Sequence, residues 1–419
     1  MKNNINFKET NISWIGEIPI EWSLIRAKYL FNRTKEINKD LRCKNLLSLT
    51  YEGVLNKDFY ASEGLRPENY NTYQLFDKDD LVFKMIDLEN VKTSRVGIVH
   101  EYGIMSSAYI CFKPLKEKIY PKFSYWFFYD LYKKEIYNSI GSGVRSTLSS
   151  DDMSEFEIPV PKIKEQKIIS RYLDKKITQI NSLVEKIQKK IKVLKELRTS
   201  LINQCVTKGL DPNVEMKDSG VEWIGKMPKH WNVKKIKYVS NQISEKRLPV
   251  DGDIKISPEN VESGTGGITN YYSDYDTEGQ IFQSGDILFN KLRVYLNKVV
   301  LCDFDGLSMG EMIVIRPVYV MGNFLHKILS SNGLINHVNS LSEGVKLPRP
   351  SVSCILDTFI PIPPEDEQTS ISESIQTKLG YIDLVITKHS DRIRLMQEYR
   401  QSIIFSVVTG KVRITEDRI

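Results

Sequence analysis

Apolar residues recur at alternating steps of four and three over two long stretches of the chain, residues 164–208 and 364–411. This heptad pattern predicts two helices with one apolar stripe each, roughly 60 Å long at about 1.5 Å per residue. A helix with a single stripe needs a partner in water, and the other helix is the most available one, so we expect an antiparallel pair. The stripe of the first helix consists of Leu173, Ile177, Ile180, Val184, Ile187, Ile191, Leu194, Arg198, Leu201 and Cys205, and that of the second of Ile375, Leu379, Ile382, Ile386, His389, Ile393, Met396, Arg400, Ile403 and Val407.

An arginine interrupts both stripes at the same step, Arg198 in the first and Arg400 in the second. A polar residue at such a position either sets the register of a helix pair or extends along the helix into solvent. Both interpretations stay open on the sequence alone.

Outside the long helices the apolar runs are short, which predicts strands mixed with shorter helices in an α+β arrangement. Helices are expected around residues 121–138 and 321–340. The expected strands are LVFKM (81–85), VGIV (96–99) and YICFKP (109–114), and then ILFNK (287–291), VVLCD (299–303) and MIVIRP (312–317).

These elements belong to an internal repeat of about two hundred residues. WIGEIPIEW (14–22) returns as WIGKMPKHW (223–231), and IPVP (158–161) followed by Glu-Gln returns as IPIP (360–363) followed by Glu-Gln. The ends of the two copies are alike, whereas their middles share little. One scaffold that carries two different recognition surfaces explains this pattern, and an old duplication that drifted where nothing constrained it is the alternative.

Composition narrows the class of protein further. The 419 residues contain no apolar run that could cross a bilayer, and the five cysteines stand singly, which favours reduced thiols in the cytoplasm. The net charge of +6 permits a polyanionic partner without requiring one. Lys and Arg greatly outnumber Asp and Glu in the first long helix, which indicates either a solvated face or a surface near nucleic acid or an acidic partner.

Catalytic motifs are missing from the sequence. It has no phosphate-binding loop, no dinucleotide fingerprint and no cluster of histidines at metal-ligand spacing. Asp251, Asp253 and Lys255 could hold Mg²⁺ near a phosphate, but a turn that leads into a strand explains the same residues. We therefore expect neither a catalytic residue nor a metal site.

Basic and amide side chains at matched places are candidates for contact with a polyanion, through phosphates or base edges, although basic residues on such loops are also common simply as solvent-exposed side chains. Three lie around the strands of the first copy, four lie in the matching segment of the second, and one lies in each of two Gly/Ser-rich loops. They are Lys84, Lys92 and Arg95, then Asn290, Lys291, Arg293 and Lys298, and finally Arg145 and Lys346.

With tryptophan arms, divergent middles, I-P-x-P followed by Glu-Gln, and two long helices in tandem, the sequence resembles the specificity subunit of type I restriction–modification enzymes. The resemblance covers essentially the whole chain. It implies two α+β target recognition domains separated by two long antiparallel coiled-coil helices. The expected organisation is a first recognition domain with an N-terminal arm (1–163), a spacer helix (164–208), a second recognition domain with its arm (209–363), a second spacer helix (364–411) and a tail (412–419).

The resemblance also implies the partners. Each recognition domain would read one half of a bipartite, asymmetric site in double-stranded DNA, and the helices would fix the spacing and dock two methyltransferase subunits. Restriction and translocase subunits would join through the complex, and S-adenosylmethionine, ATP and Mg²⁺ would belong to the partner subunits. The N-terminal arm should lie near the end of the second long helix. The rival hypotheses are a stand-alone DNA-modifying or DNA-cleaving enzyme and a purely structural coiled-coil scaffold.

Overall fold

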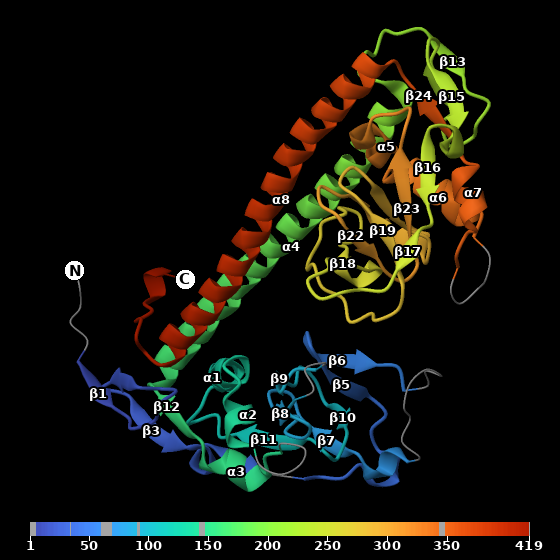
Figure 1. The fold of residues 1–419 in the computed structure, drawn as a ribbon. Coiled ribbons are helices and arrows are strands. Elements are labelled where there is room, and N and C mark those ends of the chain that lie inside the picture. The colour runs from blue at the N-terminus through green and yellow to red at the C-terminus, as the bar shows by residue number, and fades with distance from the viewer. Residues whose placement is uncertain are drawn as a thin grey trace. The chain divides into compact units, whose positions relative to one another are not determined.

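The computed structural model describes residues 6–33, 35–59, 69–89, 93–141, 147–342 and 348–418 (Figure 1). The chain divides into two compact units. Unit 1 consists of Met1–Ile187 and Asp391–Ile419, and unit 2 consists of Gln188–Ser390. Each long helix therefore contributes one part to each unit.

Two four-stranded sheets of short strands form the frame of unit 1. The first has the order β4-β11-β8-β9 and is antiparallel, and the second has the order β6-β5-β10-β7 and contains the parallel pair β5–β10. Two-stranded pairs β1-β2 and β12-β3 complete the unit. The elements are β1 (Phe7–Glu9), β2 (Glu17–Pro19), β3 (Ser23–Arg26), β4 (Phe31–Arg33), β5 (Leu46–Thr50), β6 (Gly53–Lys57), β7 (Gln74–Phe76), β8 (Leu81–Phe83), β9 (Val96–Ile98), β10 (Gly103–Met105), β11 (Ile110–Pro114), α1 (Pro121–Lys133), α2 (Ile136–Ile140), α3 (Ser150–Glu155) and β12 (Glu157–Val160).

Unit 2 has the same frame. Its antiparallel sheet has the order β16-β23-β20-β21, and its second sheet has the order β17-β19-β22-β18 with the parallel pair β18–β22. Pairs β13-β14 and β15-β24 complete this unit. The elements are β13 (Met216–Asp218), β14 (Lys226–Pro228), β15 (Asn232–Lys235), β16 (Ser240–Ile243), β17 (Lys246–Arg247), β18 (Lys255–Ile256), β19 (Gly279–Phe282), β20 (Ile287–Asn290), β21 (Val299–Leu301), β22 (Gly306–Ser308), β23 (Met312–Pro317), α5 (Gly322–Leu329), α6 (Asn332–Ser340), α7 (Val352–Leu356) and β24 (Phe359–Ile362).

The repeat extends further in structure than in sequence. The middles share few residues, yet β5 and β18 each pair in parallel with the matching strand, β10 or β22. The two middles differ in the segment after β5 or β18. Unit 1 has the hairpin β5–β6, whereas unit 2 has a turn of 3-10 helix at Pro258–Asn260 and irregular chain. The expected α+β class is confirmed, and the units differ by local insertion on a common frame.

The two predicted long helices are α4 (Ile163–Lys208) and α8 (Glu365–Val408). In unit 1 the beginning of α4 shares one hydrophobic core with the end of α8, and in unit 2 the beginning of α8 shares a core with the end of α4. The pairing is therefore antiparallel in both units, as expected. Every stripe position is buried or half-buried.

The seam arginines make different contacts. Arg198 is only 15% exposed in its side chain, and its Nε lies 3.1 Å from Asp383 Oδ1 of α8. It also donates a hydrogen bond of 3.0 Å to the Gly264 carbonyl, so the interpretation that it extends into solvent is wrong. Arg400 donates to Asn181 Oδ1 at 3.1 Å.

A buried glutamine joins each long helix to its unit. Gln166 donates to the carbonyls of Pro161 (2.8 Å) and Lys118 (3.2 Å), and its Oε1 accepts from the Tyr120 amide at 2.6 Å. Gln368 repeats this arrangement with the Pro363 carbonyl at 3.0 Å and the Met321 amide at 2.9 Å. The repeated Glu-Gln motif thus satisfies backbone groups at the base of the neighbouring helix, α1 or α5.

The repeated tryptophan phrase lies where one long helix begins and the other ends. Trp231 donates to Glu367 at the start of α8, and the Trp22 indole donates to Glu165 at the start of α4. At the opposite ends, a Cβ at Gly410 after α8 would lie 2.5 Å from Pro19 and 3.1 Å from Trp22, and one at Gly209 after α4 would lie 3.2 Å from Trp231, so both glycines lie close to the repeated phrase.

The expected closure between the N-terminal arm and the end of the second long helix is confirmed. Lys411 Nζ donates to the Ile15 carbonyl at 3.1 Å, and Ile15 shares a core with Val407 and Val408. None of the helices in the described ranges combines the length and the apolar character that a membrane span needs.

Gln166→Ala should lower the free energy of unfolding of unit 1 by about 3 kcal/mol, because it leaves buried backbone groups without a partner. Hydrogen exchange at the Tyr120 amide should accelerate with it. Gln179→Ala, an exposed glutamine of the same helix, is the matched control and should change stability by less than about 0.5 kcal/mol. Equal losses in the two variants would contradict the joining role of Gln166.

Gly410→Ala should destabilise unit 1 more than Gly16→Ala. Both glycines have left-handed backbones, with φ of +73° and +69°, so both substitutions cost about 1 kcal/mol in strain. A Cβ at Gly410 would also lie 2.5 Å from Pro19 Cδ, whereas the nearest atom at Gly16 is the flexible Lys411 Nζ at 3.5 Å. We expect a further loss of about 1–3 kcal/mol for Gly410→Ala in urea unfolding. If Gly410→Ala loses no more free energy of unfolding than Gly16→Ala, Pro19 moves aside at little cost and the close packing at Gly410 is not required.

Candidate nucleic-acid interface

The ends of several strands meet around one hollow in unit 1. The hollow has a volume of about 610 Å³ and is bordered by residues that follow β4 and β8, precede β11, and open α3. Arg33 and Lys35 bring positive charge to it, Asp151 brings one negative charge that pairs with Arg33, and Gln74, Ser107 and Ser149 bring polar groups. A concave surface of loop ends with two bases and one acid can accept a polyanion.

Hydrogen bonds tie the Gly/Ser-rich loops to the segments that follow the central strands. In unit 1 the Leu148 amide donates to the Met85 carbonyl at 2.9 Å. In unit 2 the Arg293 amide donates to the Pro348 carbonyl at 3.0 Å. Both units therefore bring the same two segments together, one after β8 or β20 and one after the Gly/Ser-rich loop.

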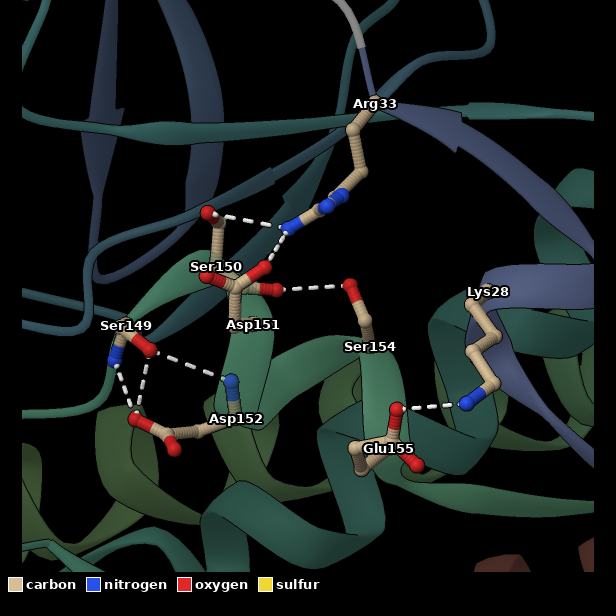
Figure 2. Close-up of polar contacts among 8 residues, drawn as sticks. All are labelled: Lys28, Arg33, Ser149, Ser150, Asp151, Asp152, Ser154 and Glu155. Atoms are coloured by element: carbon tan, nitrogen blue, oxygen red, sulfur yellow. Dashed lines mark hydrogen bonds and ion pairs between the residues drawn. The ribbon is translucent and has the colours of Figure 1, made fainter.

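The start of α3 holds the Arg33 side chain beside this hollow. Figure 2 shows the Arg33 guanidinium over Ser150 and Asp151, with 3.4 Å to Ser150 Oγ and an ion pair to Asp151. Ser149 caps α3 by accepting from the Asp152 amide, and the Asp152 carboxylate accepts from the Ser149 amide in return. This capping box fixes the helix terminus that orients Arg33.

Arg95 and Asn290 hold turns together. Arg95 is 2% exposed and donates to the carbonyls of Ile86 (3.2 Å) and Asp87 (2.6 Å), and burial lowers the pKa of its guanidinium. Asn290 is 4% exposed and bonds both the amide and the carbonyl of Leu292. A side chain that contacts DNA has to reach the surface, and these two do not.

The remaining candidates lie nearer the surface. Lys84 is half-buried, with its Nζ 3.2 Å from Thr93 Oγ1, and Lys298 donates to the Pro258 carbonyl at 2.6 Å. Lys291 forms an ion pair with Glu311, and this contact lowers the pKa of the Glu311 carboxyl. Arg293 is exposed and has a left-handed backbone with φ of 54°. Lys92, Arg145 and Lys346 lie outside the described residues.

Three basic residues at these surfaces were not among the candidates predicted from the sequence. Arg33 and Lys35 line the hollow of unit 1, and Arg349 pairs with Glu311 at 2.9 Å beside Lys291. The sequence carried a weak signal for each, since Arg33 and Lys35 follow the end of a repeated segment and Arg349 lies three residues after Lys346. Only the folded chain shows that Glu311 brings Arg349 and Lys291 together.

Asp253, the central residue of the possible metal site at Asp251, Asp253 and Lys255, forms an ion pair with Arg247 instead. Both carboxylate oxygens of Asp253 accept from Arg247, at 2.6 and 2.7 Å, and this contact lowers the pKa of Asp253 to about 2. Lys255 is 8% exposed and donates to the Tyr275 carbonyl. In the part of the chain that the structure describes, no three His, Cys, Asp or Glu side chains gather where they could hold a metal ion.

Comparison with known proteins gives one consistent result. The family model described as the type I restriction modification DNA specificity domain matches residues 30–193. The chain is 25% identical to the type I restriction enzyme MjaVIII specificity subunit of Methanocaldococcus jannaschii, over 98% of this chain and 96% of that protein. It is 21% identical to the type I restriction enzyme EcoDI specificity subunit of Escherichia coli, over 70% of each.

Solved structures share the fold. A chain from a structure on complex assembly and conformational transition of the type I R-M system superimposes with a TM-score of 0.72 at 11% identity, covering 94% of this chain and 99% of that one. The HsdS subunit from Thermoanaerobacter tengcongensis gives a TM-score of 0.54 at 12% identity, covering 94% and 98%. Residues 30–193 therefore match the type I restriction modification DNA specificity domain, and nearly the whole chain is similar in sequence and fold to the specificity subunits of type I restriction enzymes, a family that is non-catalytic.

Proposed function

We propose that each unit reads one half of a bipartite, asymmetric DNA site. The observation that carries this proposal is the common frame of the two units with a different insertion in each, the hairpin β5–β6 in unit 1 and the Pro258–Asn260 turn in unit 2. Two copies of one frame suit two similar tasks, and different insertions suit two different base sequences. An asymmetric target follows, because the two halves of the subunit are not identical.

Within each unit, DNA contact falls to the surface formed by the segment after β8 or β20 and the flank of the Gly/Ser-rich loop. Arg33, Lys35 and Lys84 would serve unit 1, and Lys291, Arg293 and Arg349 would serve unit 2. Arg145 and Lys346 stay candidates for base or phosphate contact on their loops. Arg95 and Asn290 would act indirectly, by holding the turns that carry these side chains.

The long helices would fix the distance between the half-sites and dock two methyltransferase subunits. Half-sites on one face of a duplex need a separation near whole helical turns, about 34–36 Å each, and a stiff helix pair maintains such a distance better than a flexible linker. Apolar side chains outside the stripe support docking on the helices. They are Val193 and Leu197 on α4 and Tyr381, Leu384, Leu395 and Tyr399 on α8, all at least 50% exposed.

The other subunits of the complex would carry out the catalytic reactions. S-adenosylmethionine would bind the methyltransferase subunits, and ATP and Mg²⁺ would serve the restriction and translocase subunits that join the complex. A stand-alone nuclease would need a catalytic cluster, and Asp253, the centre of the one candidate, is engaged by Arg247. A purely structural scaffold leaves the different insertions without a purpose.

Arg293→Ala should weaken binding of the complex to its target DNA by about tenfold and leave the stability of unit 2 within about 0.5 kcal/mol, because this side chain is exposed. Arg95→Met should instead affect stability. It should lower the free energy of unfolding of unit 1 by about 3 kcal/mol, because three backbone carbonyls lose their buried donor. Fluorescence anisotropy with target duplex and urea unfolding measure the two effects. Unchanged DNA affinity for Arg293→Ala would remove that residue from the interface.

Exchange of residues 32–140 for the corresponding segment of another family member should change one half-site of the methylated motif and leave the other half unchanged. The reason is that this segment contains β5 to β11 and the insertion of unit 1 but no residue of unit 2. Modification-sensitive long-read sequencing of host genomes with each chimera gives both half-sites directly. A motif altered in both halves would contradict the modular assignment.

A further inference from the structure

One turn in the insertion of unit 2 is fastened to a long helix. We call residues 262–267 the glycine turn. Arg198 of α4 donates from Nη1 to the Gly264 carbonyl in the middle of this turn, at 3.0 Å. The Nε of the same guanidinium lies 3.1 Å from Asp383 Oδ1 of α8. One largely buried side chain therefore joins α4, α8 and the glycine turn.

The glycine turn also supports the segment that carries the proposed DNA contacts of unit 2. The Gly264 amide donates to the Asn297 carbonyl at 2.9 Å, and Asn297 ends the 3-10 turn that begins after Arg293. Lys298, the next residue, donates to the Pro258 carbonyl at 2.6 Å. Contacts therefore lead without a break from α4, through Gly264, to the chain beside Arg293.

The glycine turn has little burial to hold it in place. Residues 262–265 are all exposed, and an exposed turn rich in glycine has many conformations open to it. Thr265 Oγ1 donates to Glu262 Oε2 at 2.7 Å, and the Glu262 amide donates to the Gly267 carbonyl at 2.7 Å. These bonds shape the turn from within. The hydrogen bonds of Gly264 to Arg198 and Asn297 attach its middle to the rest of unit 2.

Packing of the helix pair does not require an arginine at this step. The preceding and following stripe positions are Leu194 and Leu201, and a partly buried guanidinium costs desolvation energy that one ion pair offsets only in part. Lys327 adds a second cation, and burial together with the charge of Arg198 lowers the pKa of Lys327. A leucine at position 198 would avoid both costs. The contact with the glycine turn gives a reason for the arginine that helix packing does not.

Unit 1 fastens its insertion in another way. Arg400 stands at the same step of α8, but it donates to Asn181 Oδ1 of α4 at 3.1 Å. In the ranges of unit 1 that the structure describes, it makes no hydrogen bond to β5, β6 or the turn between them. Tyr51 in that turn accepts instead from Lys133 Nζ of α1, at 3.4 Å. A seam arginine thus holds the insertion of unit 2, whereas a lysine of a short helix holds the hairpin of unit 1.

We propose that Arg198 is a positioning residue for recognition by unit 2: it holds the glycine turn against α4 and thereby fixes the chain that carries Lys291 and Arg293. The proposal rests on the proposed function, in which unit 2 reads one half of the DNA site. Arg198 acts through the turn and not by contact with DNA. Without it, the turn and the segment after β20 would move, and matched and mismatched half-sites would be bound with more nearly equal affinity.

The test measures discrimination by the complete complex with its methyltransferase subunits. The probes are duplexes of the methylated motif of the wild-type system, either fully matched or with one mismatched base pair in one half-site. The half-site of unit 2 is the one that exchange of residues 32–140 leaves unchanged. Arg198→Met should lower the ratio of matched to mismatched affinity at this half-site by about tenfold, and should change the ratio at the other half-site by less than about twofold.

Two variants show whether the helix pair alone explains such a result. Arg400→Met removes the equivalent guanidinium from α8 and is the matched control, so discrimination at both half-sites should stay within about twofold of the wild type. Asp383→Asn breaks the ion pair between the helices but keeps the bond from Arg198 to Gly264, and it should also leave discrimination unchanged. If Asp383→Asn has the same effect as Arg198→Met, Arg198 acts through the helix pair and the proposal is overturned.

Hydrogen exchange separates a loss of position from a loss of fold. In Arg198→Met the Gly264 amide should exchange about tenfold faster, whereas the amides of β20 and β23 should exchange as in the wild type. If the β20 and β23 amides also exchange faster, Gly264→Val replaces this variant. Gly264 and Gly220 both have left-handed backbones, with φ of +78° and +71°, and open space around a Cβ, so valine strains either turn without a clash. Gly264→Val should lower discrimination at the half-site of unit 2, and Gly220→Val should not. Equal discrimination in these two variants would overturn the proposal.

Failure of the proposed function has a different signature. If the wild-type complex methylates no bipartite motif, the proposed function itself is wrong. If it methylates one and Arg198→Met discriminates at both half-sites as the wild type does, the proposed function stands and only the positioning role of Arg198 is refuted.

Discussion

A buried glutamine in the first turn of each long helix is the contact on which the rest of the structure depends. Gln166 and Gln368 each complete the hydrogen bonds of a strand end and of a neighbouring helix start, and the glutamate before each accepts from a tryptophan of the repeated phrase. Buried backbone groups left unpaired at these places would cost about 1–3 kcal/mol each. The direction of the helix is therefore coupled to the recognition unit at its base. The glycine that ends the other helix packs against the same tryptophan and closes the junction.

The strands and loops that lie far from this junction can differ between the two units. The sheet that contains β5 or β18 keeps its parallel pairing in both units, because that pairing involves backbone groups and tolerates almost any side chain on the insertion. Unit 1 uses this freedom for a hairpin and unit 2 for irregular chain. A specificity subunit benefits from this division, since a change of insertion need not disturb the junction.

Charged side chains also have different roles in different parts of each unit. Near the proposed DNA surfaces, basic side chains follow the central strands, and buried residues such as Arg95 and Asn290 shape the turns that carry them. At equivalent places of the two units one carboxylate pairs with two bases: Glu155 with Lys28 and Arg26, and Asp357 with Lys237 and Lys235. The seam arginines add a link of another kind, because Arg198 connects α4 both to α8 and to the loop at Gly264 within unit 2.

The sequence by itself determined the two long helices and their antiparallel pairing, the duplication and the strands β8, β9, β11, β20, β21 and β23, because heptad steps, short apolar runs and a repeated phrase are local signals that folding leaves intact. The helices expected around 121–138 and 321–340 are each divided in two, α1 and α2 in one case and α5 and α6 in the other, and the remaining short strands carried no such signal. It also placed the N-terminal arm at the end of α8, since a closed repeat requires that contact. Which candidate side chains reach the surface was decided only by the tertiary structure. Arg95 and Arg293 look alike in sequence, yet one is buried against carbonyls and the other is exposed, because burial depends on contacts between distant segments. The meeting of Lys291 with Arg349 around Glu311, and of Lys28 with Glu155, likewise depends on strand pairing that no local pattern specifies.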